Sequence, residues 1–199
     1  MLYSVLTGKF KIRRTHMKTL ILNGSPRKNG DTAAMINRLL ERLDGESLVI
    51  NAYRDNISPC VDCRRCRTVK GCVIKDDMQK VYEYIADCDC VVIASPVYYS
   101  ELTGRLLDVA SRFQMYFSAK YFMNEPFEIK PKKGGVLLAA GGLGSAERAY
   151  DTARSLLTYI NAKDIYPMIC SKNTDVLPAA EDTARLDEID RLAGFLNGE

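Results

Sequence analysis

Residues 23–32 are Asn23-Gly24-Ser25-Pro26-Arg27-Lys28-Asn29-Gly30-Asp31-Thr32, and they lie between a short apolar run and a helical pattern. The apolar run predicts a buried strand, and the Gly and Pro residues predict a turn that leads into the helix. The first N–H groups of a helix have no intrahelical acceptors and carry the positive end of the helix dipole. Arg27 or Lys28 adds positive charge. We therefore expect this segment to bind phosphate.

The remaining chain alternates apolar runs with amphipathic segments, without internal repeats or a linker that would mark a second domain. This alternation predicts parallel strands connected by helices. We expect strands at 19–22, 48–50, 90–94, 135–140 and 165–169, and helices at 32–43, 76–86, 103–117, 146–161 and 181–196. The expected fold class is α/β, a flavodoxin-like three-layer sandwich with a five-stranded parallel sheet of order 2-1-3-4-5.

Ligands of such sheets bind beside the carboxyl ends of the strands. Three loops of unusual composition are expected there, at 23–32, 96–100 and 140–145. Tyr98 or Tyr99 has the chemistry to stack on a flat ring, and backbone amides in these loops have the chemistry to bond ring carbonyls and nitrogens. The alternative is that the two tyrosines only cap the sheet.

The motifs that the first loop lacks restrict which phosphate compound it could bind. It has no G-x-x-x-x-G-K-[ST] motif, which disfavours P-loop nucleotide chemistry, and no G-x-G-x-x-G motif. The second strand is followed by Asn51 rather than by an acid that binds a ribose 2′-hydroxyl, which disfavours a resident dinucleotide. A mononucleotide remains, and FMN fits best.

Four cysteines, Cys60, Cys63, Cys66 and Cys72, lie within thirteen residues. Soft thiolates at this density select an iron–sulfur cluster or zinc. The two-residue gaps favour a cluster, because structural zinc sites more often use two separated pairs of cysteines. The third alternative is a set of reduced or redox-active thiols without metal.

The other cysteines, Cys88, Cys90 and Cys170, lie in or beside predicted strands, and we expect them in the core. Seven cysteines in a chain without a secretory signal indicate a reducing compartment, so we expect a cytoplasmic protein.

Residues 1–16 contain four of the 28 basic residues and no acidic residue. We interpret them as a disordered or non-native leader that precedes one domain at 17–199. No basic stripe indicates nucleic-acid binding, and no apolar run is long enough for a membrane span. The single histidine, His16, lies in this leader, so no His-dependent hydrolysis is expected.

Three motifs together carry a family resemblance: the 23–32 segment, Ser95-Pro96-Val97-Tyr98-Tyr99, and Cys72-Val73-Ile74-Lys75-Asp76-Asp77-Met78. With them the chain resembles the NADPH-dependent FMN reductase family of flavodoxin-like proteins over about 17–195. Its cysteines resemble those of the iron–sulfur flavoproteins. Where family members carry a Lys and an Asp-Arg pair in the helix after the second motif, this chain has Arg105 and Ser111-Arg112, so the Asp is absent.

The resemblance implies roles for particular residues. The FMN phosphate end would be bound by Ser25, Arg27, Asn29, Gly30, Asp31 and Thr32. The ring and ribityl chain would meet Pro96, Val97, Tyr98, Tyr99 and Ser100, with Gly141 and Gly142 closing the far side. Cys60, Cys63, Cys66 and Cys72 would hold a [4Fe–4S] cluster.

The expected function is that of an NAD(P)H-dependent FMN oxidoreductase, whose flavin accepts hydride at N5 and passes electrons to a quinone, a flavin or another small acceptor. The alternative is an iron–sulfur flavoprotein that exchanges single electrons with a ferredoxin-like partner. We also expect a homodimer or homotetramer, because one small domain has little with which to cover a flavin ring. The interface is expected to involve 119–133 and the cysteine loop.

Overall fold

The structure, a computed structural model, describes residues 16–199, so the leader predicted at 1–16 lies outside the described residues except for His16. The strands are β1 Lys18–Asn23, β2 Glu46–Asn51, β3 Cys90–Pro96, β4 Lys132–Ala140, β5 Ala162–Ile165 and β6 Ile169–Lys172. The helices are α1 Asp31–Arg42, α2 Met78–Asp87, α3 Gly104–Ser111, α4 Gln114–Tyr121, α5 Glu147–Tyr159 and α6 Thr183–Asn197. No helix in this part of the chain is long and apolar enough to cross a bilayer.

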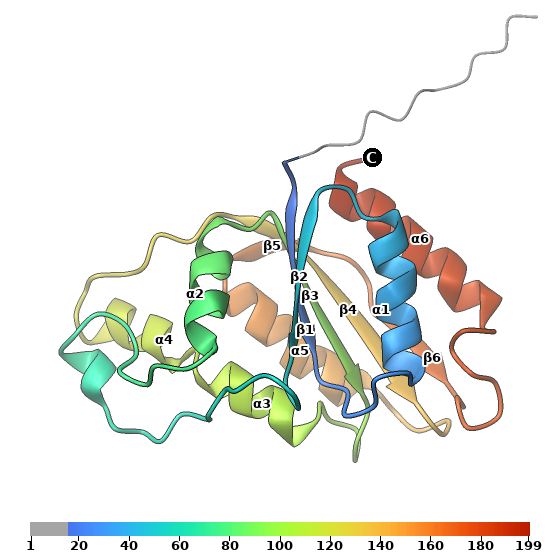
Figure 1. Cartoon of the computed structure of the whole chain (residues 1–199), viewed down its shortest axis with the longest axis horizontal. Helices are drawn as coiled ribbons and strands as arrows, with labels where there is room; N and C mark the ends of the chain where they lie inside the picture. The colour runs from blue at the N-terminus through green and yellow to red at the C-terminus, as the bar shows by residue number, and fades with distance from the viewer. Residues whose placement is uncertain (1–15) are drawn as a thin grey trace, which may run out of the picture.

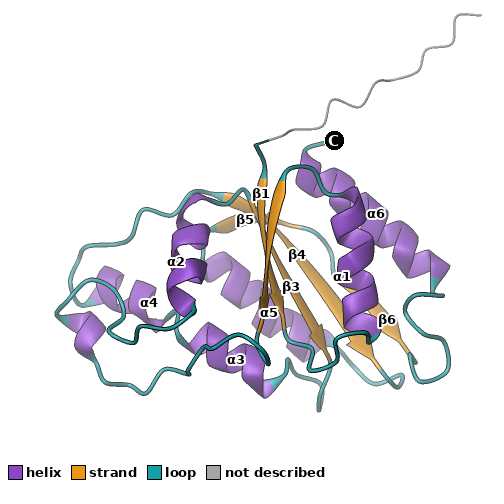
Figure 2. Cartoon of the chain, in the orientation of Figure 1, coloured by secondary structure: helices purple, strands orange, loops and turns teal. Residues whose placement is uncertain are grey.

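The strands form one parallel sheet of order β2-β1-β3-β4-β5, and β6 also pairs with β4 (Figure 2). In its register, Leu20 of β1 lies opposite Leu48 of β2 and Val91 of β3. The predicted strand order is confirmed. The carboxyl ends of β1, β3 and β4 therefore meet at one edge of the sheet.

Helices cover both faces of the sheet (Figure 1). Helices α1 and α6 pack on one face, and α2, α3, α4 and α5 lie on the other. Side chains of β1 alternate between these two halves of the core: Leu20 and Leu22 belong to one, and Ile21 to the other. Strands buried on both faces need apolar residues at every position, which explains their unbroken apolar runs.

The helix predicted at 103–117 is interrupted. The structure has α3 and α4 instead, separated by Arg112 and Phe113. Short i→i+3 bonds turn the chain at this point, from Arg112 N to Val109 O at 3.1 Å and from Phe113 N to Ala110 O at 2.9 Å. The apolar spacing continues through the turn, so periodicity did not reveal the break. Because α4 extends to Tyr121, the connection predicted at 119–133 also begins inside a helix.

The strand predicted at 165–169 is replaced by two short strands, β5 and β6, which lie along successive parts of β4. The segment 166–168 between them contains Pro167. Proline has no N–H to donate to a ladder, which accounts for the gap. The prediction that this part of the chain pairs beside β4 is correct. The predicted strand at 165–169, however, falls mainly on the segment between β5 and β6.

Candidate functional site

A cavity of about 220 Å³ opens where β1, β3 and β4 end. The segments after these strands, which the sequence predicted, form most of it, and the segment after β6 completes it. The lining residues are Ser25, Pro26, Arg27, Gly30, Asp31, Thr32, Pro96, Val97, Tyr98, Ala139, Gly141, Thr174 and Asp175. We call this cavity the strand-end pocket.

The first wall of the strand-end pocket is held against α3 by a close backbone approach. Gly24 N donates to Ala94 O at 2.8 Å, and Thr103 Oγ1 donates to Gly24 O at 2.8 Å. A Cβ atom on Gly24 would lie 2.9 Å from both Thr103 Oγ1 and Leu106 Cδ2. Glycine is required here because any side chain would push the loop away from α3.

The N-terminus of α1 opens into the same pocket. Gly30 is its N-cap residue, and no side-chain hydrogen bond caps the helix. Ser25 Oγ accepts from Arg27 N at 3.2 Å, which holds the preceding turn, while the Arg27 side chain is exposed at the pocket wall. An uncapped helix N-terminus beside a guanidinium suits a phosphate dianion. This donor set fits the phosphate end of FMN.

The second wall ends in a tight hairpin. Tyr98 and Glu101 exchange backbone hydrogen bonds of 2.9 and 3.0 Å. Tyr99 and Ser100 form its tip with φ angles of 52° and 63°, in the left-handed region where non-glycine residues are strained. The Tyr99 side chain is 100% exposed. The sequence places a bulky aromatic residue where Asn or Gly is ordinarily found.

The third wall joins two loops. Asn173 N donates to Gly142 O at 2.9 Å, and Thr174 N donates to Ala140 O at 3.0 Å. The carboxylate of Asp31 accepts from Ala179 N at 2.9 Å, which ties α1 to the segment after β6. The sequence did not predict Thr174 and Asp175 as site residues. The last strand was expected to end at 169, so the loop after Lys172 was not expected at this edge of the sheet.

Most of the predicted cofactor residues lie together. Nine of them line the strand-end pocket: Ser25, Arg27, Gly30, Asp31, Thr32, Pro96, Val97, Tyr98 and Gly141. Asn29, Tyr99, Ser100 and Gly142 lie in the same loops but outside its lining. The pocket thus combines a phosphate-binding end with a wall of proline, valine and tyrosine that suits a flat ring.

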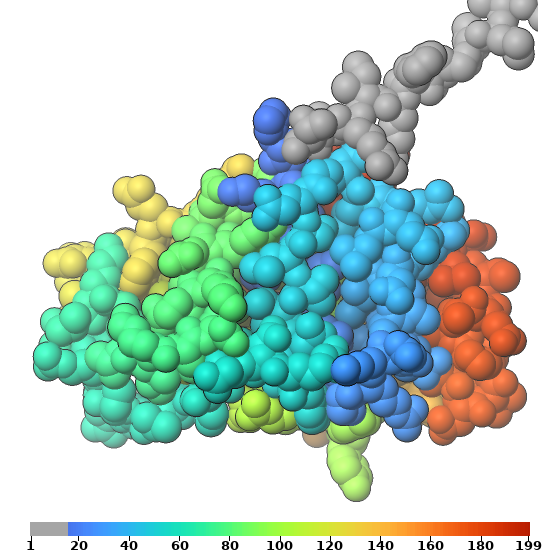
Figure 3. All heavy atoms as spheres, viewed as in Figure 1, coloured from blue at the N-terminus to red at the C-terminus, as the bar shows by residue number. Residues whose placement is uncertain are grey.

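The four predicted metal-ligating cysteines line a second, smaller pocket, together with Arg112 and Ser118. They belong to the cysteine segment, residues 60–72, which lies at one end of the molecule, far from α6 (Figure 3, turquoise). Asp62, Arg64 and Gly71 within it have left-handed backbones, with φ of 47°, 60° and 104°. The segment is irregular, with one short turn of 3₁₀ helix at Arg65–Arg67.

The cysteine thiols share a pocket but are not gathered around one point. Among the described residues, no group of three or more His, Cys, Asp or Glu side chains is placed to hold a metal ion. Cys66 Sγ donates to Ser118 Oγ at 3.2 Å. Four unpaired thiols on one pocket wall are a donor set that fits a thiolate-bound metal, and binding requires the segment to draw them together.

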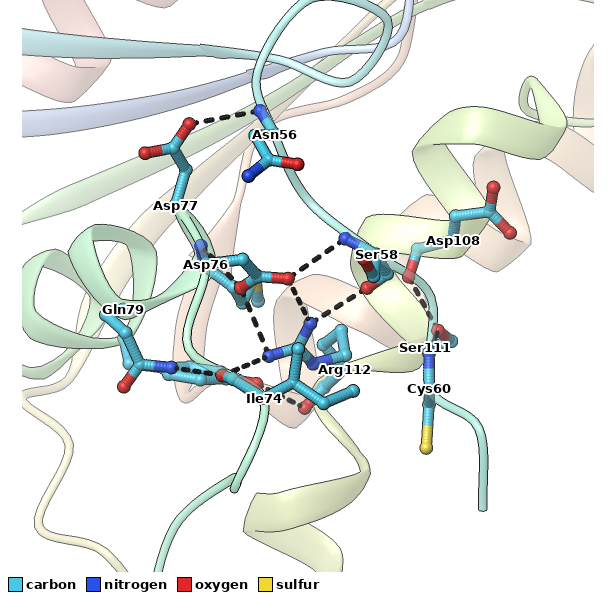
Figure 4. A network of polar contacts seen from close by, with 12 residues as sticks. Asn56, Ser58, Cys60, Ile74, Asp76, Asp77, Gln79, Asp108, Ser111 and Arg112 are labelled. Carbon is cyan, nitrogen blue, oxygen red and sulfur yellow. Dashed lines mark hydrogen bonds and ion pairs between the residues drawn. The ribbon is translucent and has the colours of Figure 1, made fainter. Parts of the chain in front are cut away.

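The base of the cysteine segment is a buried ion pair, shown in Figure 4. Arg112 Nη1 lies 2.8 Å from Asp76 Oδ2, and the exposed fractions of the two side chains are 0% and 5%. Burial opposes ionisation of the Asp76 carboxyl, but hydrogen bonds from Arg112, Ser58 N and Met78 N outweigh burial, so the pKa of Asp76 lies below its ordinary value. The pair is therefore charged at neutral pH.

The remaining cysteines lie away from both pockets. Cys88 and Cys90 are buried, and burial raises the pKa of their thiols to about 11 and about 12. Their predicted place in the core is confirmed. Cys170 is only partly buried and packs against the core from β6.

Comparison with known proteins gives consistent matches. The family model described as NADPH-dependent FMN reductase matches residues 17–173. An iron–sulfur flavoprotein of Methanosarcina thermophila is 26% identical over 186 residues, which cover 89% of this chain and 92% of that protein. One from Archaeoglobus fulgidus is 30% identical over 161 residues, covering 79% and 75%.

Solved structures share the fold. An NAD(P)H:quinone oxidoreductase from Methanothermobacter marburgensis superposes with a TM-score of 0.70 at 17% identity, covering 92% of this chain and 98% of that chain. An FMN-dependent NADH-azoreductase from Bacillus anthracis, solved in complex with FMN, has a TM-score of 0.65 at 17% identity, covering 91% and 100%. At these identities the likeness shows a common architecture.

Proposed function

The chain belongs to the NADPH-dependent FMN reductase family, and from this premise we propose that it is an FMN-dependent oxidoreductase that transfers electrons from NAD(P)H to a small-molecule acceptor. The observation that carries the proposal is the strand-end pocket, in which an uncapped helix N-terminus and Arg27 face the same cavity as Pro96, Val97 and Tyr98. Residues 17–199 form the FMN-binding domain in this proposal.

The residues of the pocket bind and orient. The N–H groups at the start of α1, with Arg27 and Thr32, would hold the phosphate, and Val97 and Tyr98 would lie against the ring. FMN, when bound, supplies the hydride-accepting chemistry. Because the flavin carries this chemistry, no side chain of the pocket is assigned as a general acid or base.

The proposal is tested by FMN binding to an Arg27→Ala variant. Losing one charge-assisted contact to phosphate is expected to weaken FMN binding about tenfold. Riboflavin, which lacks the phosphate, should bind wild type and variant equally. Lys28→Ala is the matched control, because Lys28 is the adjacent exposed cation and lies outside the pocket lining. Equal FMN affinities for the two variants, measured by fluorescence titration, would contradict the proposed site.

A second candidate function rests on the cysteine pocket. Four thiols on one wall, and relatives named iron–sulfur flavoproteins, favour an electron carrier that holds a [4Fe–4S] cluster and exchanges electrons with a ferredoxin-like protein. Anaerobic purification followed by iron, zinc and acid-labile sulfide analysis distinguishes a cluster from zinc and from free thiols. Iron without sulfide, or neither metal, would remove this candidate and leave the oxidoreductase proposal in place.

We further propose a homodimer or homotetramer in the cytoplasm. The segment 119–133 presents Tyr121 and Phe122, which are 61% and 50% exposed, beside the cysteine segment, where Arg67 lies over the Phe122 ring at 4.2 Å. All seven cysteines are unpaired, which suits a reducing compartment. Light scattering tests the assembly, and a monomer at micromolar concentration would contradict it.

A further inference from the structure

Arg112 lies at the point where the cysteine segment begins and ends. Its Nη1 donates to Ser58 O at 2.8 Å, and its Nη2 donates to Ile74 O at 3.2 Å. Ser58 precedes Cys60 by two residues, and Ile74 follows Cys72 by two residues. One guanidinium therefore joins the two ends of the segment (Figure 4).

Further contacts reinforce this junction, which we call the neck and define as Ser58, Ile74, Asp76, Ser111 and Arg112. Asp76 Oδ2 accepts from Ser58 N at 3.0 Å, and Ser111 Oγ accepts from Cys60 N at 2.9 Å. Ser111, at the end of α3, and Arg112, which follows it, thus hold the start of the cysteine segment. The interruption between α3 and α4 allows Arg112 to turn inward to make these contacts.

The guanidinium has one donor left over. Within the described part of the chain, Arg112 Nε is buried and has no hydrogen-bond partner. A buried N–H without an acceptor is costly and rare, and it calls for an explanation such as a ligand. Arg112 lines the cysteine pocket together with Cys60, Cys63, Cys66 and Cys72. The missing acceptor is therefore expected in that pocket.

We propose that Arg112 is a positioning residue for the cysteine pocket: it fixes both ends of the segment, and its Nε–H donates to an anionic sulfur of a thiolate-bound metal centre. This inference rests on the proposed metal centre and extends it to a residue outside the cysteine motif. The acceptor is a cysteine thiolate or a bridging sulfide.

The charges at the neck suit this role. Asp76 offsets the buried charge of Arg112, which leaves the neck neutral until anionic thiolates form nearby. A metal centre on four thiolates carries net negative charge, and a fixed donor in a buried setting stabilises it without reorganisation. Lysine cannot reproduce this arrangement, because it lacks both the planar fork and the Nε donor.

The test compares Arg112→Lys with Arg105→Lys. Arg105 lies on α3, which ends just before Arg112. It pairs with Asp108 on the surface and does not line either pocket, so it is the matched control. In metal-free protein, hydrogen–deuterium exchange at the Ser58 and Cys60 amides should be at least tenfold faster in R112K and unchanged in R105K. In protein reconstituted anaerobically with iron and sulfide, the reduction potential followed by electron paramagnetic resonance should be more negative in R112K alone.

Two further variants separate the parts of the proposal. Ser111→Ala should speed hydrogen–deuterium exchange at the Cys60 amide, because this amide loses its acceptor. The reduction potential should be unchanged, since the Arg112 guanidinium stays in place. Asp76→Asn should move the potential in the opposite direction to R112K, because the positive charge is no longer offset. If R112K does not fold, judged by circular dichroism, the Asp76→Asn shift decides the question.

Equal potentials and equal exchange in R112K and R105K would overturn the inference, and so would a wild-type protein that takes up no iron or zinc. FMN content, measured on the same samples, reports separately on the proposed oxidoreductase. Loss of FMN from the wild type would count against that function, whereas retained FMN with no metal would count against the proposed metal centre and, with it, the role of Arg112.

Discussion

The strand-end pocket is formed by loops that follow neighbouring strands of the sheet, whereas the cysteine pocket is formed largely by one mostly exposed segment. In the first, parallel strands end side by side and place three loops together, with Gly24 bonded directly to Ala94 and Thr103. In the second, residues 60–72 are joined to the domain through the neck, through a contact from Cys66 to Ser118 and through Arg67, which lies over the Phe122 ring. The walls of the first pocket follow from the order of the strands, whereas the four thiols of the second are not gathered around one point.

This difference suggests that the two sites respond differently to mutation. Changes near the strand-end pocket should affect folding and FMN together, because the sheet itself forms the walls. Substitutions in the cysteine segment should change only the content of the proposed metal. Substitutions at the neck should change the free energy of unfolding and its dependence on pH. The following predictions test this separation, from the largest expected effect to the smallest.

If the proposed metal centre is correct, replacing one of the four cysteines should remove metal from the protein. Cys63→Ala leaves three thiols in the pocket, and we expect loss of nearly all bound iron or zinc with unchanged FMN content. Cys170→Ala is the control, because Cys170 lies on β6 outside the segment. Metal and flavin are measured on the same purified samples. A variant that loses both would show that the two pockets are not independent.

Neutralising the buried acid at the neck should lower stability by about 3 kcal/mol at pH 7, because Arg112 is left with an uncompensated charge in Asp76→Asn. The pKa of Asp76 is lowered on folding, so its contribution is complete above its ordinary value of 3.8 and is lost as the pH falls through the folded value. The difference between wild type and variant should therefore shrink in acid.

Urea unfolding at several pH values measures this difference. Asp62→Asn is a suitable control, since Asp62 pairs with Arg64 on the surface, where ion pairs contribute little. A gap between wild type and D76N that stays constant down to pH 2 would show that folding does not lower the pKa of Asp76.

Adding one methyl group at Gly24 should cost about 1–3 kcal/mol of stability, because the Cβ atom of Gly24→Ala would press on Thr103 and Leu106 at 2.9 Å. FMN affinity should fall with it. Gly142→Ala makes the same chemical change in a loop where the new Cβ meets no atom within 4 Å, and its stability should hardly change. Similar unfolding midpoints for the two variants would contradict the close backbone packing.

Relieving the backbone strain at the hairpin tip should have the smallest effect on stability, and this effect should be stabilising. Asparagine tolerates a left-handed backbone better than tyrosine, so Tyr99→Asn is expected to stabilise the protein by roughly 0.5–1 kcal/mol. If the exposed ring assists the acceptor, KM for a quinone should rise while FMN affinity is unchanged. A destabilised variant would mean that Tyr99 has packing partners in an assembly.

The sequence was sufficient for the strand order and for most of the strand-end pocket, because unbroken apolar runs and the Gly-rich and Pro-rich loops are local signals. It did not predict the break at Arg112 or the contribution of Thr174 and Asp175. At the break, Arg112 contacts Asp76, which is 36 residues away, and apolar periodicity does not record such a contact. Thr174 and Asp175 follow β6, the second of the two short strands into which the predicted last strand is split.

Because of the neck, the two ends of the cysteine segment are held together without any contact from a cysteine sulfur. Since Arg112 already holds Ser58 and Ile74 together, lengthening the chain between them costs only the slow, logarithmic entropy of a longer loop, about 0.6 kcal/mol per doubling. Evolution or an engineer can therefore exchange the whole segment for one of another length and sequence. The flavodoxin-like domain would serve as an unchanged host for such insertions.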